Sequence, residues 1–157
     1  MVTVIAAILF LAVGFVFGGI LGAVVLGERA VFYKQLADKH LCIMDVFKHW
    51  LMMLEGGGKI EAYFLENGYR DIAVYGMGYL GERLLKGLDG TNIRVKYLID
   101  RQYRSVYGEV PVVSMEDALE PVDVIVVTPV YDFYTIKRQL KLRTDDKIIS
   151  MEDIFKG

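Results

Sequence analysis

The sequence predicts an α/β protein in which a single N-terminal transmembrane helix and a connecting amphipathic helix precede a small five-stranded parallel sheet. Three observations support this fold class. Residues 2–27 carry no charged side chain, and residues 29–55 repeat apolar positions at helical spacing. Beyond residue 59, short β-prone runs alternate with helical stretches, which is typical of a parallel sheet with helical crossovers.

We therefore expect a transmembrane anchor at residues 1–28, a connecting helix with a glycine linker at 29–58, and an α/β domain at 59–157. The chain is 54% hydrophobic, above the roughly 45–50% usual for soluble proteins, and the excess lies in the anchor. The net charge of −2 gives no reason to expect nucleic acid as a partner. The single cysteine, Cys42, excludes an intramolecular disulfide.

The anchor prediction rests on length and composition. As a helix, residues 2–27 extend over about 39 Å, enough for a hydrocarbon core of about 30 Å, and Thr3 is their only polar side chain. The alternative is a cleaved signal peptide, which has a basic start and an apolar core of about 7–15 residues. Nothing basic precedes this segment and it is too long, so we expect an uncleaved anchor.

Flanking charge predicts the orientation of the anchor. Arg29, Lys34, Lys39 and Lys48 follow the span, whereas only Met1 precedes it. Because basic flanks stay on the cytoplasmic side, we expect a single-pass protein of the cell membrane. Its N-terminus would lie outside and its α/β domain in the cytoplasm.

Three glycines of the anchor share one helix face. Gly14, Gly18 and Gly22 recur every four residues, a spacing that lets a second membrane helix approach closely. This predicts association with a second copy or with a partner membrane protein. The alternative is that these glycines reflect composition alone, since glycine is frequent in membrane helices.

The connecting helix has one broad apolar stripe. Leu36, Ile43 and Trp50 recur every seven residues, and Phe47 and Leu54 repeat that step. The stripe fits a short coiled coil, a helix in the membrane interface, or a helix packed on the α/β domain. We favour packing on protein, because the lysines are too few for a strong membrane-surface helix.

A glycine linker and a short helix follow. Residues 56–58 are all glycine and break the connecting helix, and residues 60–67 form a helix that ends at the Asn67-Gly68 stop signal. Lys59 follows the glycines, but Ile60 stands where a phosphate-binding P-loop requires Ser or Thr, and no strand precedes. The segment is therefore predicted to be a linker.

A glycine-rich motif opens the α/β domain. The strand 72–75 is followed by Gly76-Met77-Gly78-Tyr79-Leu80-Gly81, a helix at 82–88, and a strand at 93–99 that ends at Asp100. This order of strand, G-x-G-x-x-G, helix, strand and acidic residue is the fingerprint of a Rossmann-like nucleotide-binding unit.

Each part of the motif has a physical role. Gly76 permits a tight turn, Gly78 lets backbone approach a phosphate at the positive end of the helix, and Gly81 permits close packing of helix on sheet. Asp100 would accept hydrogen bonds from ribose hydroxyls. The alternative is that the glycines serve packing alone.

The next positions leave the cofactor open between NAD and NADP, with a nucleotide sugar as a further candidate. Arg101 and Arg104 follow Asp100 and fit either a 2′-phosphate or solvated loop charges. The predicted binding residues are Gly76, Met77, Gly78, Tyr79, Leu80, Gly81, Asp100, Arg101, Thr128 and Pro129.

The rest of the chain completes an open sheet. The expected elements are a strand at 110–113, a short helix from Ser114 through Leu119, a strand at 123–127, a helix at 131–142, a strand at 147–149 and a capped turn at 150–153. Right-handed crossovers give the strand order 3-2-1-4-5. Ligands of such sheets bind where the order reverses, at the carboxyl ends, so the glycine motif, Asp100, Thr128 and Pro129 should surround one crevice.

The domain resembles a known class of Rossmann domains. The resemblance is carried by IAVYGMGYLGERL at 72–84, YLID at 97–100, GEVPVVSMEDAL at 108–119 and VIVVTP at 124–129. These segments are similar to the N-terminal domains of bacterial nucleoside-diphosphate-sugar epimerases and dehydratases, and of sugar acyltransferases. The resemblance covers the α/β domain and implies nucleotide binding in cell-envelope polysaccharide biosynthesis.

The sequence also departs from those enzymes. The catalytic Tyr-x-x-x-Lys of the epimerases and dehydratases has no counterpart, since Tyr134 and Lys137 are only three apart. His40 and His49 are not spaced as a metal pair, so we expect neither a metal site nor a recognisable catalytic constellation.

These observations predict a membrane-tethered nucleotide-binding module, accessory to glycan assembly. Two alternatives stay open. One is an NAD(P)-dependent oxidoreductase or epimerase-like enzyme that a partner completes, and the other is a Rossmann-like scaffold without ligand.

Overall fold

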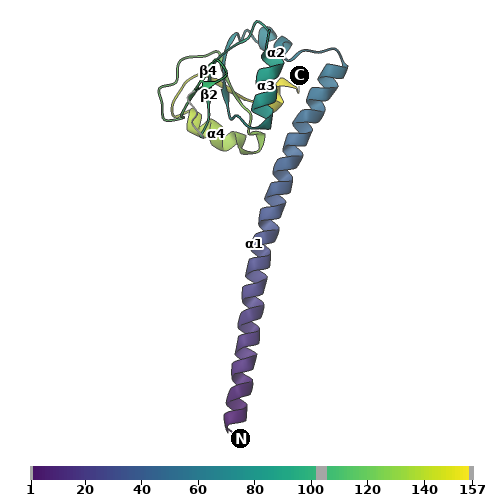
Figure 1. Ribbon diagram of the computed structural model, residues 1–157, viewed down its shortest axis with the longest axis vertical. Helices are drawn as coiled ribbons and strands as arrows, with labels where there is room; N and C mark the ends of the chain where they lie inside the picture. The colour runs from purple at the N-terminus through teal and green to yellow at the C-terminus, as the bar shows by residue number, and fades with distance from the viewer. Residues whose placement is uncertain (1, 102–105, 156–157) are drawn as a thin grey trace. The chain divides into compact units, whose positions relative to one another are not determined.

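The computed structural model describes residues 2–101 and 106–155. The chain forms two compact units, Met1–His40 and Leu41–Gly157 (Figure 1). One helix, α1 (Val2–Glu55), supplies the described residues of the first unit and continues into the second.

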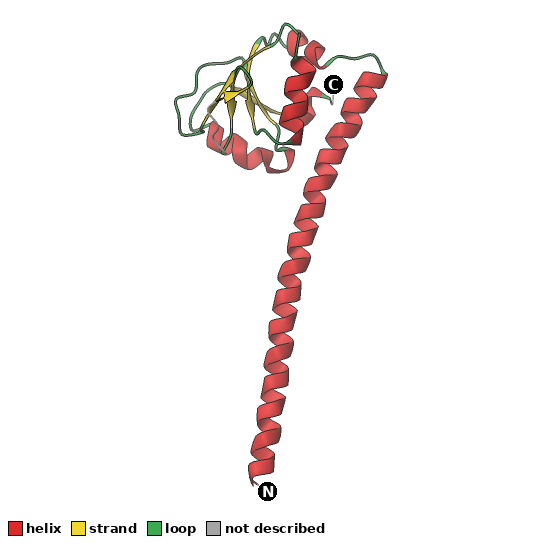
Figure 2. Cartoon of the chain, viewed as in Figure 1, coloured by secondary structure: helices red, strands yellow, loops and turns green. Residues whose placement is uncertain are grey.

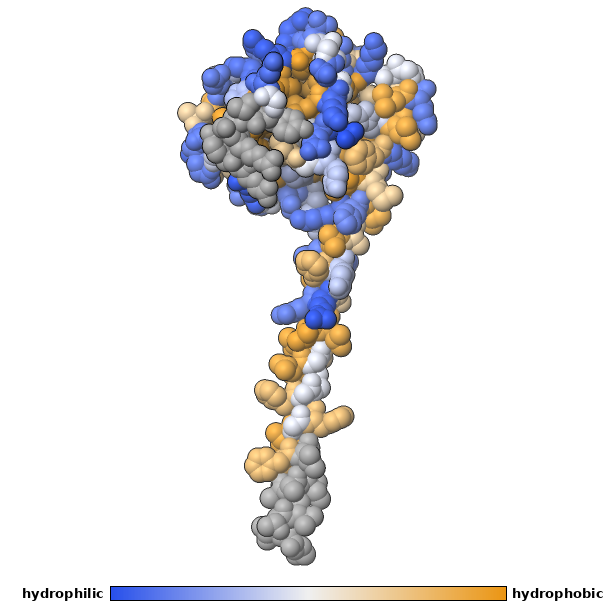
Figure 3. Space-filling model, viewed as in Figure 1, coloured by the Kyte–Doolittle hydropathy of each residue, from blue (hydrophilic) through white to orange (hydrophobic). Residues whose placement is uncertain are grey.

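α1 is the one helix among the described residues that is long and apolar enough to cross a membrane, and it lies near the N-terminus. Apolar side chains are exposed along its described part before Glu28 (Figure 3). The predicted anchor and connecting helix thus form one continuous helix. The expected boundaries at residues 28 and 58 and the membrane orientation stay predictions.

The second unit is built on a parallel sheet, as predicted. Its strands are β1 (Asp71–Tyr75), β2 (Arg94–Ile99), β4 (Val110–Val113), β5 (Val124–Val127) and β6 (Lys147–Ser150). They lie in the order β4-β2-β1-β5-β6 and pair in parallel, which confirms the order 3-2-1-4-5. A short sixth strand, β3 (Val106–Tyr107), pairs antiparallel with β4. This strand was not predicted, because it is only two residues long and the chain turns back at Gly108, whose φ is +64°.

Both faces of the sheet are buried. Successive strand residues point to opposite sides, so each strand contributes side chains to both faces. In β1, Ile72 and Val74 face one apolar cluster, whereas Ala73 and Tyr75 face another. This two-sided burial explains why β1 and β5 are continuous apolar runs.

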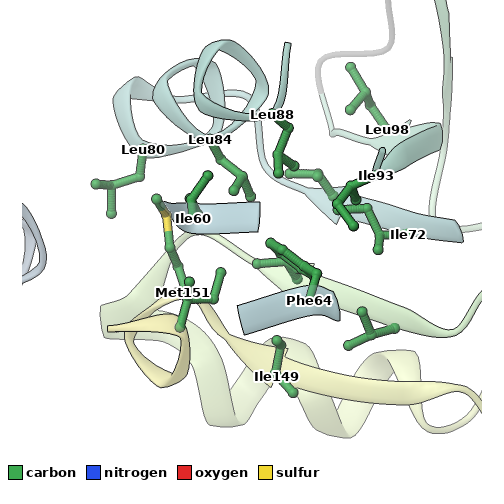
Figure 4. Close-up of a cluster of buried hydrophobic side chains, with 14 of the residues drawn as sticks. Ile60, Phe64, Ile72, Leu80, Leu84, Leu88, Ile93, Leu98, Ile149 and Met151 are labelled. Atoms are coloured by element: carbon green, nitrogen blue, oxygen red, sulfur yellow. The ribbon is translucent and has the colours of Figure 1, made fainter. Parts of the chain in front are cut away.

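Helices cover the two faces unequally (Figure 2). The remaining helices are α2 (Ile60–Glu66), α3 (Tyr79–Leu88), the 3₁₀ turn η1 (Val130–Asp132), α4 (Phe133–Leu140) and the 3₁₀ turn η2 (Met151–Ile154). Residues of α2, α3 and η2 pack on one face, and residues of α4 pack on the other. Figure 4 shows the first cluster, in which Leu84 and Leu88 of α3 gather with Phe64 of α2 and Ile72 of β1.

The C-terminal part of α1 belongs to this core, so the prediction that it packs on protein is confirmed. Val46 is only 1% exposed, and the Trp50 ring stacks on Phe155 with centroids 5.3 Å apart. Gly87 of α3 leaves room for this indole, because a Cβ there would lie 3.1 Å from Trp50 Cζ2.

Part of the predicted stripe was wrong. Leu36, Phe47 and Leu54 are exposed, whereas Val46 and Met53 contact the core beside Trp50. The true contact face follows the three-four spacing of helix packing, and a strict seven-residue step does not separate it from the neighbouring position.

The predicted helix from Ser114 through Leu119 is also wrong, because the segment forms a turn. Its capping bond is present, since Ser114 N donates to Asp117 Oδ2 at 2.8 Å. Pro121 follows too soon, however, and disfavours helical backbone at the residue before it. The predicted helix at 131–142 is likewise shorter, with η1 and α4 together ending at Leu140.

The packing of α1 on the domain can be tested at Trp50. Replacing Trp50 with Ala should lower the free energy of unfolding by about 2 kcal/mol, since a half-buried indole is removed. Leu51→Ala is the matched control, because Leu51 lies on the same turn and is 56% exposed. Thermal unfolding followed by circular dichroism measures both variants. Equal stability of the two would contradict this packing.

Candidate functional site

The glycine motif forms a tight turn at the carboxyl end of β1. Gly76 has a φ of +91°, a left-handed conformation that favours glycine. A Cβ on Gly76 would lie 2.8 Å from Pro129 Cδ and 3.0 Å from Thr128 Oγ1. Both the backbone angle and the contact with the end of β5 therefore require glycine at this position.

Gly81 brings α3 against this turn. A Cβ on Gly81 would overlap the carbonyl oxygen of Gly76 and lie 3.5 Å from Thr128 Oγ1. A larger residue at position 81 would therefore push the start of α3 away from the sheet.

The start of α3 presents free backbone donors to an open space. The first helical bond runs from Glu82 N to Gly78 O at 3.0 Å, so the N–H groups of Tyr79, Leu80 and Gly81 precede the intrahelical ladder. No described heavy atom lies within 4 Å of where a Cβ on Gly78 would stand. Open space beside the positive end of a helix is a suitable environment for a phosphate.

The Thr128 side chain supports the turn from the end of β5. Its hydroxyl is buried and lies 2.8 Å from the Gly76 carbonyl oxygen and 3.0 Å from that of Tyr75. The Tyr75 carbonyl also accepts a backbone bond from Thr128 N at 3.0 Å, so the hydroxyl adds a second bond there and supplies one to the Gly76 carbonyl in the turn. In this arrangement Thr128 supports the glycine motif and does not line the crevice in front of it.

Asp100 contacts the same turn from the end of β2. Its Oδ2 atom accepts a hydrogen bond from Met77 N at 2.8 Å. The carboxylate therefore sits beside the glycine motif, where the sequence expects it, and one of its oxygens fixes the loop. Its role toward ribose stays a prediction.

These elements surround one open crevice of about 410 Å³. It is lined by Tyr75, Gly76, Met77, Gly78, Asp100, Arg101, Pro129, Asp132 and Ile136. Of the other predicted site residues, Tyr79 is 79% exposed, Leu80 is buried in the core, and Gly81 and Thr128 lie behind the turn. Arg104 lies outside the described residues.

Sequence reasoning missed Tyr75, Asp132 and Ile136 as lining residues. Tyr75 is the last residue of β1, and a side chain at a strand end borders whatever binds there. Asp132 and Ile136 are four residues apart around the start of α4, so they share one face. That spacing was a usable signal once Pro129 had been assigned to the crevice.

A second cavity of about 440 Å³ adjoins the first. It is lined by Tyr75, Arg101, Ser114, Met115, Glu116 and Gln139, so Tyr75 and Arg101 border both cavities. The hydrogen bond from the Ser114 hydroxyl is the main cause that lowers the pKa of Glu116 below its usual value, with smaller contributions from Arg143 and Arg101. Glu116 is therefore an anion at neutral pH.

Among the described residues, the crevice offers binding groups but no recognisable catalytic pair. Tyr134 is 79% exposed, and Lys137 Nζ lies 5.2 Å from the centroid of the Phe133 ring. Within residues 2–101 and 106–155, no group of three or more His, Cys, Asp or Glu side chains could hold a metal ion.

Comparison with known proteins adds no identity to this geometry, because neither a family model nor a curated protein matches the chain. The arrangement of turn, helix start and carboxylate is consequently the basis for a functional interpretation.

The supporting role of Thr128 predicts a stability effect. Thr128→Val keeps the shape of the side chain but leaves the Gly76 carbonyl facing a methyl group, whereas the Tyr75 carbonyl keeps its bond from the backbone N–H of residue 128. The change should cost about 1–3 kcal/mol of unfolding free energy. Thr135→Val is the control, since Thr135 is an exposed residue of α4. Urea titration separates the two, and an unchanged midpoint for Thr128→Val would contradict the role.

Proposed function

We propose that the chain is a membrane-tethered nucleotide-binding module that takes NAD(P) or a nucleotide sugar. The observation that carries this proposal is the open space at Gly78 in front of the first turn of α3. Unpaired helical N–H groups and the helix dipole favour an anion there. Asp100 and Arg101, which line the same crevice, supply an acceptor for ribose hydroxyls and a cation for a phosphate.

An accessory role in cell-envelope polysaccharide biosynthesis is part of this proposal. It is supported by the resemblance of residues 72–84, 97–100, 108–119 and 124–129 to Rossmann domains of nucleotide-sugar enzymes and sugar acyltransferases. The crevice fits binding better than turnover, because its lining has acidic, basic and apolar groups but no paired Tyr and Lys. A tethered module of this kind would present or sense a nucleotide beside an enzyme that performs the chemistry.

The ligand site is tested at Gly78. A valine there fills the space that the phosphate would enter, so nucleotide affinity should fall by more than tenfold while the fold is kept. Arg83→Ala is the control, because Arg83 is an exposed residue of α3 that does not line the crevice. Calorimetric titration of the full chain in lipid nanodiscs with NAD, NADP, coenzyme A and UDP-sugars measures the affinities.

The same experiment discriminates between ligands. Thermal unfolding in the presence of each ligand is the second measurement. A ligand at 100 times its dissociation constant should raise the free energy of unfolding by about 2.7 kcal/mol. If Arg101→Ala loses NADP binding and keeps NAD binding, the guanidinium contacts the 2′-phosphate. If the parent binds none of these nucleotides, or Gly78→Val binds them as the parent does, the proposal is wrong and a ligand-free scaffold takes its place.

The membrane tether and its orientation are tested by cysteine labelling. With the domain in the cytoplasm, an impermeant thiol reagent should not modify Cys42 in intact cells but should modify it after permeabilisation. Because Cys42 is only half-exposed, a second variant carries Cys42→Ser with Leu142→Cys, whose position is 86% exposed. Efficient labelling of either protein in intact cells would contradict the predicted orientation and place the domain outside the cell.

A further inference from the structure

Tyr75 carries a buried hydroxyl that lacks a hydrogen-bond partner among the described residues. The side chain is 4% exposed, and its ring packs in the cluster on the α4 side of the sheet. A buried hydroxyl without a partner is costly, because folding removes it from water without replacing the hydrogen bond. Phenylalanine would fill the same place without that cost, so packing alone does not account for the hydroxyl.

The position of Tyr75 suggests which group supplies the missing bond. Tyr75 borders both the crevice at the glycine motif and the adjoining cavity beside Ser114 and Gln139. Arg101, which follows Asp100 in the chain, also borders both cavities. A ligand that extends from Gly78 past Arg101 into the second cavity would therefore contact Tyr75, which lines both cavities.

The order of groups in a nucleotide fits this path. A diphosphate at Gly78 and a ribose at Asp100 leave the C1′ atom of the ribose directed away from the glycine motif, and C1′ carries the base. Around the second cavity lie the Gln139 amide, the Glu116 carboxylate and the Ser114 hydroxyl, which donates to that carboxylate. Such donors and acceptors match the polar edge of a nucleobase, and the guanidinium plane of Arg101 can stack on its face.

We propose that the cavity lined by Tyr75, Ser114, Met115, Glu116 and Gln139 binds the nucleobase, and that the Tyr75 hydroxyl hydrogen-bonds to its edge. The inference rests on the proposed nucleotide site and adds the residue that selects among bases. Arg101 and Gln139 are exposed at the rim, so their long side chains can rotate to admit the base.

The experiment compares parent and Tyr75→Phe proteins, each as the full chain in nanodiscs. The probes are ADP, GDP, UDP and CDP, with ribose 5-phosphate and inorganic pyrophosphate as probes without a base. The parent should prefer one base. Tyr75→Phe should weaken the preferred nucleotide about tenfold, the effect of losing one hydrogen bond, bring the bases closer together in affinity, and leave the base-free probes unchanged. Its melting temperature should equal or exceed that of the parent.

The alternative outcomes are distinct. If the parent binds the four nucleotides equally and no better than the base-free probes, the phosphate site stands and base recognition is overturned. If Tyr75→Phe keeps the parental base preference, or melts markedly lower than the parent, the hydroxyl has another role and the inference is wrong. If the parent binds no nucleotide, both this inference and the proposed function fail.

Tyr97→Phe is the matched control, because the Tyr97 hydroxyl already donates to Glu120 O at 2.7 Å. This change should leave the base preference intact while lowering stability.

Discussion

The close approach of α3 to the end of β1 is the constraint on which the candidate site depends. It exists only because Gly76 and Gly81 lack a Cβ: one contacts Pro129 and Thr128 of the neighbouring strand end, and the other contacts the Gly76 carbonyl. The Thr128 hydroxyl then lies within hydrogen-bond distance of the carbonyls of Tyr75 and Gly76, where the turn leaves the strand. The crevice, the open helix start and the position of Asp100 all follow from this contact.

The parallel sheet could be predicted from sequence because its strands are apolar on both faces. Runs such as Val124–Val127 have no polar alternation, and only a sheet covered on both sides buries them completely. The roles of Gly76 in the turn and of Gly81 in close packing were also predictable, since both follow from the absence of a Cβ. The lining residue Tyr75 was not predictable in the same way, because which strand-end side chains border a crevice depends on how neighbouring loops turn.

One repeated tetrapeptide adopts two different structures in this chain. The tetrapeptide Ser-Met-Glu-Asp occurs at 114–117 and again at 150–153, each time after a parallel strand. Both copies make the same bond, from the serine N–H to the aspartate carboxylate at 2.8 Å. Only the second opens a 3₁₀ helix, because Ile154 follows it into the core, whereas the first is followed by Pro121. Capping chemistry marks a possible start, and burial of the residues that follow decides whether a helix forms.

The stacking of Trp50 on Phe155 has a spectroscopic consequence. Trp50 is the only tryptophan of the chain, and it lies where the helix that continues from the apolar N-terminal segment contacts the last described residue of the domain. All tryptophan fluorescence of the protein therefore comes from this one contact. Loss of this contact would expose the ring to water and shift its fluorescence to longer wavelength. The fluorescence of Trp50 thus reports on the contact between the C-terminal part of α1 and the α/β domain.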